Sequence, residues 1–222
     1  MYQLMTIITA AISVALLMFS AMVHEVAHGW VAYKLGDPTA KNAGRLTLNP
    51  KAHLDPFGSI VLPLIMVLLK GPVFAYAKPV PYNPRNLRHP DRDEVLVAIA
   101  GPASNILQAL IGALLFDILY PLLPLSLYGP AYWLLYILSS YVYVNLMLAF
   151  FNLIPLPPLD GSKIIMPLLH GEARQKYYAI QQYAMPILII VLYLVPMVFH
   201  VDPLGIYLNV TADRLYSLLL GA

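Results

Sequence analysis

MYQLMTIITAAISVALLMFSAMV, residues 1–23 of the chain, contains no Asp, Glu, Lys, Arg or His and runs directly into the cluster HEVAH, residues 24–28. An apolar run of this length predicts a helix that crosses a lipid bilayer. An ionisable side chain in such a helix costs about 2.5 kcal/mol or more, so these residues usually face the protein interior and serve a function. We therefore expect the rest of the chain to be organised around this cluster.

The spacing within the cluster indicates its chemistry. Residues four apart lie on the same face of a helix, so His24 and His28 can bind one metal ion. Zinc accepts neutral imidazole ligands and keeps an open position in catalytic sites. Glu25 lies about 100° round the helix from His24, where it can reach a zinc-bound water as a general base without binding the metal. This HExxH arrangement is typical of zinc peptidases.

Composition indicates an integral membrane protein. Of the 222 residues, 60% are hydrophobic and 11% are charged, whereas soluble domains average about 45–50% and 25%. The net charge of +2 is too small to suggest nucleic-acid binding, and the chain has no cysteine for a disulfide or a thiolate metal site. We expect a single domain, residues 1–222, that holds one Zn²⁺ per chain through His, Asp or Glu.

Apolar runs predict an all-α polytopic membrane protein with about five to six membrane segments. Residues 58–69 are apolar but short, which predicts a re-entrant piece, although the sequence leaves open whether it crosses the bilayer. Small β-strands are expected near the active site, at Arg45–Leu48, where polar and apolar residues alternate, and at Val73–Tyr82, whose prolines indicate an edge. The longer segments that we expect lie at about 3–34, 95–119, 131–151, 183–198 and, more weakly, 204–220.

Basic residues predict the orientation of the chain. Lysines and arginines gather in the stretches 34–51 and 70–92, which follow the first two apolar segments. Loops rich in these residues usually lie in the cytoplasm. We therefore expect a multi-pass protein of the cell membrane whose active site lies near the cytoplasmic side.

A second acidic residue in apolar surroundings, Asp160, lies in the stretch NLIPLPPLDG, residues 152–161. Its prolines remove backbone donors and preclude a regular helix. Irregular backbone at membrane depth is tolerated only where it is buried in protein or lines a wet cavity. A catalytic zinc site needs a third protein ligand, and Asp160 is the best candidate.

These two motifs together resemble those of the site-2 proteases, the intramembrane zinc metalloproteases. The match consists of HEVAH at 24–28 and of Asn152 with the later PPLDG at 157–161, and the stretch from Ala100 to Asn105 also resembles the central span of that family. The resemblance implies that His24, His28 and Asp160 bind zinc, that Glu25 is the general base, and that Asn152 contacts the substrate backbone or the oxyanion.

The same resemblance implies the substrate and the setting. Such an enzyme hydrolyses peptide bonds within or next to the transmembrane segments of membrane proteins, in regulated intramembrane proteolysis, and works in the lipid bilayer. The longest polar gap in the chain is too short for a PDZ domain, and we expect no regulatory domain after the last apolar segment. We therefore expect a minimal, core-only member of the family.

Several alternatives remain open at this point. Buried His and Asp residues can also line an ion path in a membrane transporter or a metal-handling protein, although transport has no need of Glu25 beside His24. His53 is either a gate or substrate contact near the zinc, or a residue that braces its loop. Asn145 is expected to form a hydrogen bond between helices, and Asn105 to serve helix packing.

Overall fold

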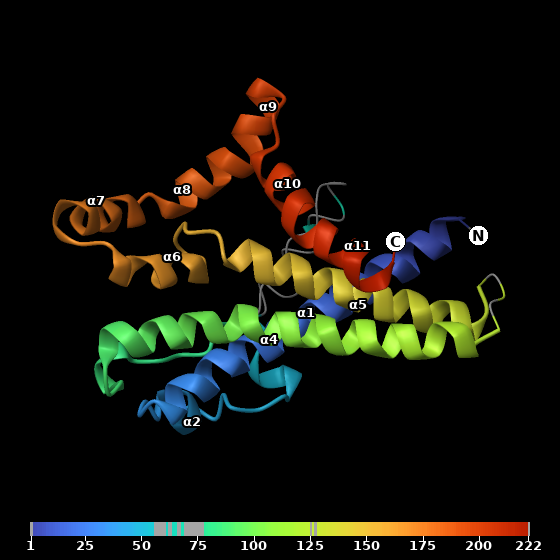
Figure 1. The fold of residues 1–222 in the computed structure, drawn as a ribbon, viewed down its shortest axis with the longest axis horizontal. Coiled ribbons are helices and arrows are strands. Elements are labelled where there is room, and N and C mark those ends of the chain that lie inside the picture. Colours follow the sequence, from blue (N-terminus) through green and yellow to red (C-terminus); the bar gives the residue numbers. More distant parts are fainter. Residues whose placement is uncertain are drawn as a thin grey trace.

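The computed structural model describes residues 2–55, 61, 64–65, 68, 78–124, 126 and 128–221. Regular structure within these residues is helical (Figure 1). The α-helices are α1 (Tyr2–Lys34), α2 (Thr39–Asn42), α4 (Pro90–Leu119), α5 (Pro130–Asn152), α6 (Asp160–Ile165), α7 (Gly171–Gln181), α8 (Ala184–Ile189), α9 (Val195–Phe199), α10 (Pro203–Leu208) and α11 (Arg214–Leu220). The 3-10 helices are η1 (Pro50–Ala52), η3 (Pro84–Asn86), η4 (Tyr120–Leu122) and η5 (Met166–Leu168), and the π-helical segments are η6 (Ile190–Leu194) and η7 (Asn209–Asp213).

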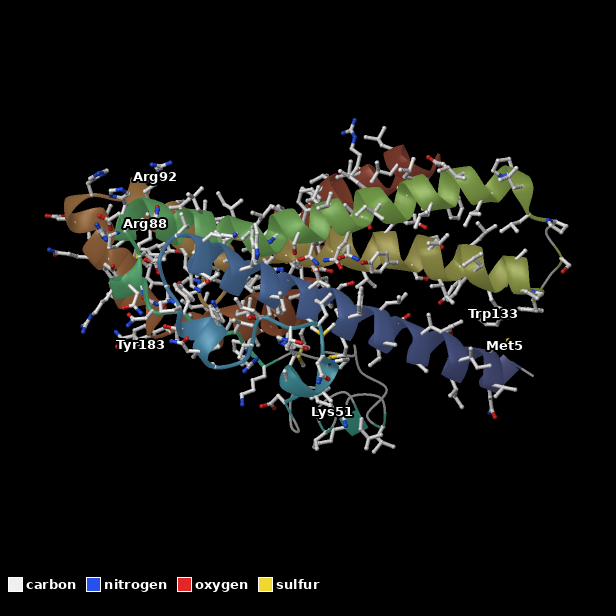
Figure 2. The ribbon with its side chains drawn as sticks, turned by 90° about the horizontal axis from the view of Figure 1, so that it is seen from below. Met5, Lys51, Arg88, Arg92, Trp133 and Tyr183 are labelled. Atoms are coloured by element: carbon white, nitrogen blue, oxygen red, sulfur yellow. The ribbon has the colours of Figure 1, made fainter. Side chains whose placement is uncertain are left out.

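Three long helices, α1, α4 and α5, lie side by side and carry the site (Figures 1 and 2). Small residues allow α4 and α5 to approach closely, as is common between membrane helices. A Cβ atom on Gly112 of α4 would lie 3.0 Å from Cγ2 of Val142 on α5. Beside this contact lies a hydrophobic core that α10 and η7 complete by packing on α5. The buried residues of this core are Ala109, Ala113, Val142, Leu146, Leu208 and Ala212.

Within the described residues, these three helices are long and apolar enough to cross a membrane, and the number rises to four if the bent pair of residues 171–181 and 186–199 forms one span. The described part of the chain is thus helical and of the membrane class, as the sequence predicted. The expected count of five to six segments is not confirmed. Residues 203–220 are helical but consist of three short consecutive helices, α10, η7 and α11, and are not among the candidate spans. Most of the re-entrant piece expected at 58–69 lies outside the described residues.

The two small strands predicted near the site are not confirmed either. Residues 45–48 form bends and irregular backbone, and residues 78–82 are irregular. The remainder of the second predicted strand, 73–77, lies outside the described residues. Side chains rather than a sheet hold these two stretches together, because Nη2 of Arg45 donates to the carbonyl oxygens of Lys78 and Pro79.

The loop after α1 is anchored by a buried carboxylate, that of Asp37. Asp37 accepts hydrogen bonds from the backbone N–H of Asn83 at 2.6 Å, from Nδ2 of Asn86 at 2.8 Å and from the N–H of Thr39 at 3.1 Å. These bonds fix η3 against the C-terminal end of α1. The segment between residues 78 and 86 is therefore held at both ends beside the helix that carries the HEVAH cluster.

Candidate metal centre

Helix α1 places its two histidines on one buried face. His24 and His28 are 6% and 8% exposed, and their Nε2 atoms lie 3.0 Å apart. The four-residue spacing produces this convergence because side chains four apart stack along a helix. The predicted pair of imidazole ligands is thus brought together.

Asp160 reaches the same point from the first residue of α6. Its Oδ2 atom lies 3.1 Å from Nε2 of His24 and 3.1 Å from Nε2 of His28. Gly161 permits this placement, because a Cβ atom there would lie 2.5 Å from the carbonyl oxygen of Ile154. The glycine after the aspartate therefore lets α6 pack against the turn that follows α5.

A second glycine brings α4 onto the histidines. A Cβ atom on Gly101 would lie 2.5 Å from Nε2 of His24 and would also collide with Nε2 of His28. Only a residue without a side chain allows the α4 backbone this close to both imidazoles. The α4 residues Val97, Gly101 and Asn105, with His24 and His28, are called the helical wall below.

The chemistry of the three converging atoms fits a cation. Nδ1 of His28 lies 2.6 Å from the carbonyl oxygen of Val97, which can only accept, so Nδ1 carries the proton. A neutral imidazole then has a lone pair on Nε2, and that lone pair faces Nε2 of His24 and a carboxylate oxygen of Asp160. Two imidazoles and a carboxylate are a ligand set found in catalytic zinc sites. His24, His28 and Asp160 also form the group of possible metal ligands found among the described residues.

The second face of the site is built from loops. The carboxylate of Glu25 accepts a hydrogen bond from the backbone N–H of Val80 at 2.8 Å. Arg45 holds the backbone just before Val80, with Nη2 at 2.7 Å from the carbonyl oxygen of Lys78. The N–H of Lys78 donates to the carbonyl oxygen of His53 at 2.8 Å. Arg45, His53 and residues 78–80 are called the loop wall below.

A pocket of about 260 Å³ lies between the two walls. Asn152, the last residue of α5, lines the pocket and donates through Nδ2 to the carbonyl oxygen of Leu148 at 2.9 Å. An amide nitrogen carries two hydrogens, so a second one remains for a ligand.

Tyr82 also lines the pocket, and burial together with the neighbouring Glu94 carboxylate raises the pKa of its hydroxyl above the ordinary value. The pocket residues are His24, Glu25, His28, Pro79, Val80, Tyr82, Val97, Ala98, Asn152, Pro158, Asp160 and Lys163.

His53 does not line this pocket. Its side chain is 1% exposed, and Nε2 donates to the carbonyl oxygen of Thr47 at 2.8 Å. Its own carbonyl oxygen receives the N–H of Lys78. Of the two interpretations that the sequence left open, this geometry favours a loop brace over a gate.

Sequence reasoning missed the residues that hold the histidines from behind. Nδ1 of His24 lies 2.6 Å from Oδ1 of Asn105, a residue expected only to serve helix packing. The available signal was its type, because a buried amide in a membrane helix is costly and usually has a specific partner. The carbonyl of Val97 gave no comparable signal, since every residue carries one.

A buried centre of two histidines and a carboxylate beside a glutamate, set among helices that can cross a bilayer, defines a membrane-embedded metallopeptidase. Comparison with known proteins agrees. Residues 129–195 match the model of "Peptidase family M50", a region that includes Asp160. Over 207 residues the chain is 41% identical to "Putative zinc metalloprotease YwhC" of Bacillus subtilis, covering 91% of this chain and 88% of that protein.

More distant relatives carry the same kind of name. The chain is 26% identical over 176 residues to "Putative zinc metalloprotease Rip2" of Mycolicibacterium smegmatis, which covers 79% of this chain and 64% of that protein. It is 27% identical over 181 residues to the Rip2 protein of Mycobacterium tuberculosis, with 80% and 64% covered. No solved structure matches the chain. The chain belongs to peptidase family M50, the site-2 protease family, and is a zinc metalloprotease.

Proposed function

We propose that this protein hydrolyses peptide bonds within or next to the transmembrane segments of other membrane proteins. The observation that carries the proposal is the convergence of His24, His28 and Asp160 on one point within 3.1 Å of one another. Their point of convergence opens on a pocket that Glu25 lines, and the helices around it can cross a bilayer. A substrate segment held in the membrane can therefore meet the hydrolytic groups there.

His24, His28 and Asp160 would hold the zinc ion. When bound, zinc lowers the pKa of a coordinated water towards 7 and polarises the scissile carbonyl. Glu25 accepts a proton from the attacking water and returns it to the leaving amine. The N–H of Val80 orients the Glu25 carboxylate for both transfers. The remaining amide hydrogen of Asn152 is directed to the substrate backbone or the developing oxyanion.

The distribution of basic residues supports an active site near the cytoplasmic side of the cell membrane. Arg88 and Arg92 lie at one end of the bundle, and Met5 and Trp133 lie at the opposite end (Figure 2). Cytoplasmic ends of membrane helices carry an excess of Lys and Arg. The α1 helix reaches this basic end at Lys34, and His24 and His28 lie in the half of α1 that leads to it.

A substrate helix must unwind before its carbonyls can be attacked, because they are bonded within the helix. We expect the backbone beside the pocket at residues 80–82 to accept the unwound segment through main-chain hydrogen bonds, as in strand addition. The main-chain groups of Lys78, the carbonyl of Pro79 and the N–H of Val80 are already bonded to His53, Arg45 and Glu25. Pro79 and Val80 line the pocket next to Glu25. A substrate paired there would lie within reach of the general base.

Glu25→Gln tests the proposed reaction. The glutamine has a similar size but cannot accept a proton, so the variant should bind about as much zinc as the wild type and cleave a transmembrane reporter at least about 100-fold more slowly. Zinc content is measured by elemental analysis on the purified proteins, and cleavage is measured in detergent or liposomes. A Glu25→Gln variant that cuts at the wild-type rate would overturn the role of Glu25 as the general base. A wild-type protein that binds zinc but does not cleave the reporter would overturn the proposal and leave a transporter or metal-handling role as the better account.

A further inference from the structure

A row of buried hydrogen bonds leads away from His24 across two neighbouring helices. Asn105 of α4 lies behind the imidazole, with Oδ1 at 2.6 Å from Nδ1. Its Nδ2 atom donates to Oδ1 of Asn145 on α5 at 2.8 Å. Nδ2 of Asn145 donates to the carbonyl oxygen of Tyr141 at 2.9 Å and to Oγ of Ser20 at 2.9 Å. Both asparagines are fully buried.

The end of this row fixes its direction. The main-chain carbonyl of Tyr141 can only accept a hydrogen bond, so Asn145 must turn its amide nitrogen towards it. The oxygen of Asn145 then faces Asn105. Because this oxygen also only accepts, Asn105 must present its nitrogen to it and its own oxygen to His24.

The direction of the row determines the state of the histidine. An oxygen at 2.6 Å from Nδ1 of His24 requires a proton on that nitrogen. A neutral imidazole carries one proton, so Nε2 of His24 keeps its lone pair and directs it at Asp160. The opposite tautomer would place an N–H where a metal ligand is needed. The same tautomer of His28 is fixed by a single direct hydrogen bond, from its Nδ1 to the carbonyl oxygen of Val97.

We propose that Asn105 and Asn145 are positioning residues that select the metal-binding tautomer of His24, with the Tyr141 carbonyl as the fixed end of the row. This inference rests on the proposed ligand set. It gives Asn145 a role in metal binding although its hydrogen bonds go to Asn105, Ser20 and Tyr141 and it does not line the pocket. A partner that orients a ligating histidine typically changes metal affinity by about 10- to 100-fold when it is removed.

The chain offers a matched control on the same two helices. Gln108 of α4 is 7% exposed, and its Oε1 atom accepts from the hydroxyl of Tyr141 at 2.7 Å. Its hydrogen bond leads to the side chain of Tyr141 and not to His24. Gln108→Leu therefore removes a buried amide between α4 and α5 that is partner to none of the hydrogen bonds of the row.

Zinc affinity of the purified full chain tests the proposal. The protein is stripped of zinc and titrated against a chromogenic chelator, with zinc alone as the probe. Asn105→Leu should weaken zinc binding by about 10- to 100-fold, and Asn145→Leu by a smaller factor of about 3- to 10-fold. Gln108→Leu should leave the affinity within about twofold of the wild type. If a leucine variant is not recovered folded, Asn145→Ala removes the same bonds with less steric demand and should fall in the same range.

The double variant Asn105→Leu/Asn145→Leu shows whether Asn145 acts through Asn105 or whether the two residues affect zinc binding independently. If Asn145 acts through Asn105, the double variant should bind zinc as weakly as Asn105→Leu alone, because residues in one network are not additive. The proposal would be overturned if the losses of zinc affinity in the two single variants multiplied in the double variant. It would also be overturned if Asn145→Leu kept the wild-type affinity, or if Gln108→Leu lost as much affinity as Asn145→Leu. His24→Ala tests the ligand set separately from the role of the two asparagines. If that variant kept full zinc affinity, the ligand set itself would be refuted.

Discussion

The metal centre has two walls that are held by different means. Close packing of α1 against α4 builds the helical wall, in which Gly101 lies against both histidines and Asn105 is hydrogen-bonded to His24. Hydrogen bonds from Arg45 and His53 to a segment of irregular backbone build the loop wall. The helical wall carries both histidines, whereas the loop wall contacts Glu25 through Val80. The difference suggests that metal affinity and turnover can be damaged separately.

Among substitutions that keep all three ligands, the largest effect on metal binding is expected from Gly101→Ala in the helical wall. The new methyl group would lie 2.5 Å from Nε2 of His24, so the imidazoles must move apart or α4 must shift. Zinc affinity, measured by chelator competition, should fall by at least about 100-fold, the upper end of the effect of removing a supporting partner.

Gly112→Ala is the matched control for that substitution. It adds the same methyl group to the same helix, at 3.0 Å from Cγ2 of Val142 and away from the metal centre. Overpacking should cost about 1–3 kcal/mol of stability and leave zinc affinity unchanged. If both glycine variants lost zinc equally, general loosening of the bundle would explain the loss and the helical wall would have no special role.

Val80→Pro tests the loop wall. Proline has no N–H, so the hydrogen bond to the Glu25 carboxylate is lost while both histidines stay in place. A hydrogen bond to a charged group is worth about 1.5–3 kcal/mol, so turnover should fall on the order of 10- to 100-fold with zinc content unchanged. Val80→Ala keeps the N–H and should cleave a transmembrane reporter near the wild-type rate. A Val80→Pro variant that lost its zinc would show that the two walls are not independent.

A smaller effect, on stability alone, is expected at Asp37, which anchors the far end of the segment 78–86, whose first residues belong to the loop wall. Burial alone would raise the pKa of Asp37, but hydrogen bonds from Thr39, Asn86 and the Asn83 backbone hold it below its ordinary value. A carboxylate whose pKa is lowered in the folded state stabilises the fold at pH values above the ordinary pKa of Asp, about 3.9. This stability is lost as the pH falls towards the lowered pKa.

Asp37→Asn should therefore lower the unfolding free energy by about 1–3 kcal/mol at pH 7. The difference from the wild type should shrink as the pH falls through 4, because the wild type loses its advantage there. Thermal unfolding in detergent at a series of pH values measures both effects, and zinc affinity at pH 7 serves as the control. A difference that grew in acid would contradict the assigned role of the carboxylate.

The sequence was sufficient to predict the three residues that meet. The spacing of His24 and His28 follows from helix geometry, and Asp160 could be selected because an acid on proline-broken backbone is costly in a membrane. The residues behind the histidines were less accessible. The pairing of Asn105 with His24 depends on the rotation of α4 against α1, which a hydrophobic pattern does not determine.

The local fold was predicted less well than the long helices. The apolar runs marked α1, α4 and α5 because their length alone distinguishes them. Alternation at residues 45–48 predicted a strand, but the structure holds this stretch through the Arg45 side chain instead. A run of four residues is too short for its pattern to distinguish a strand from an irregular stretch held by a side chain.

We expect one zinc ion to join α1 to the distant Asp160. This bridge can be tested by the zinc stoichiometry of the purified wild type and of Asp160→Ala, measured side by side after dialysis against a weak chelator. We predict about one zinc per chain in the wild type and a loss of most of it in the variant, because two imidazoles alone do not complete a catalytic zinc site. An Asp160→Ala protein that retained a full equivalent of zinc at wild-type affinity would contradict the account.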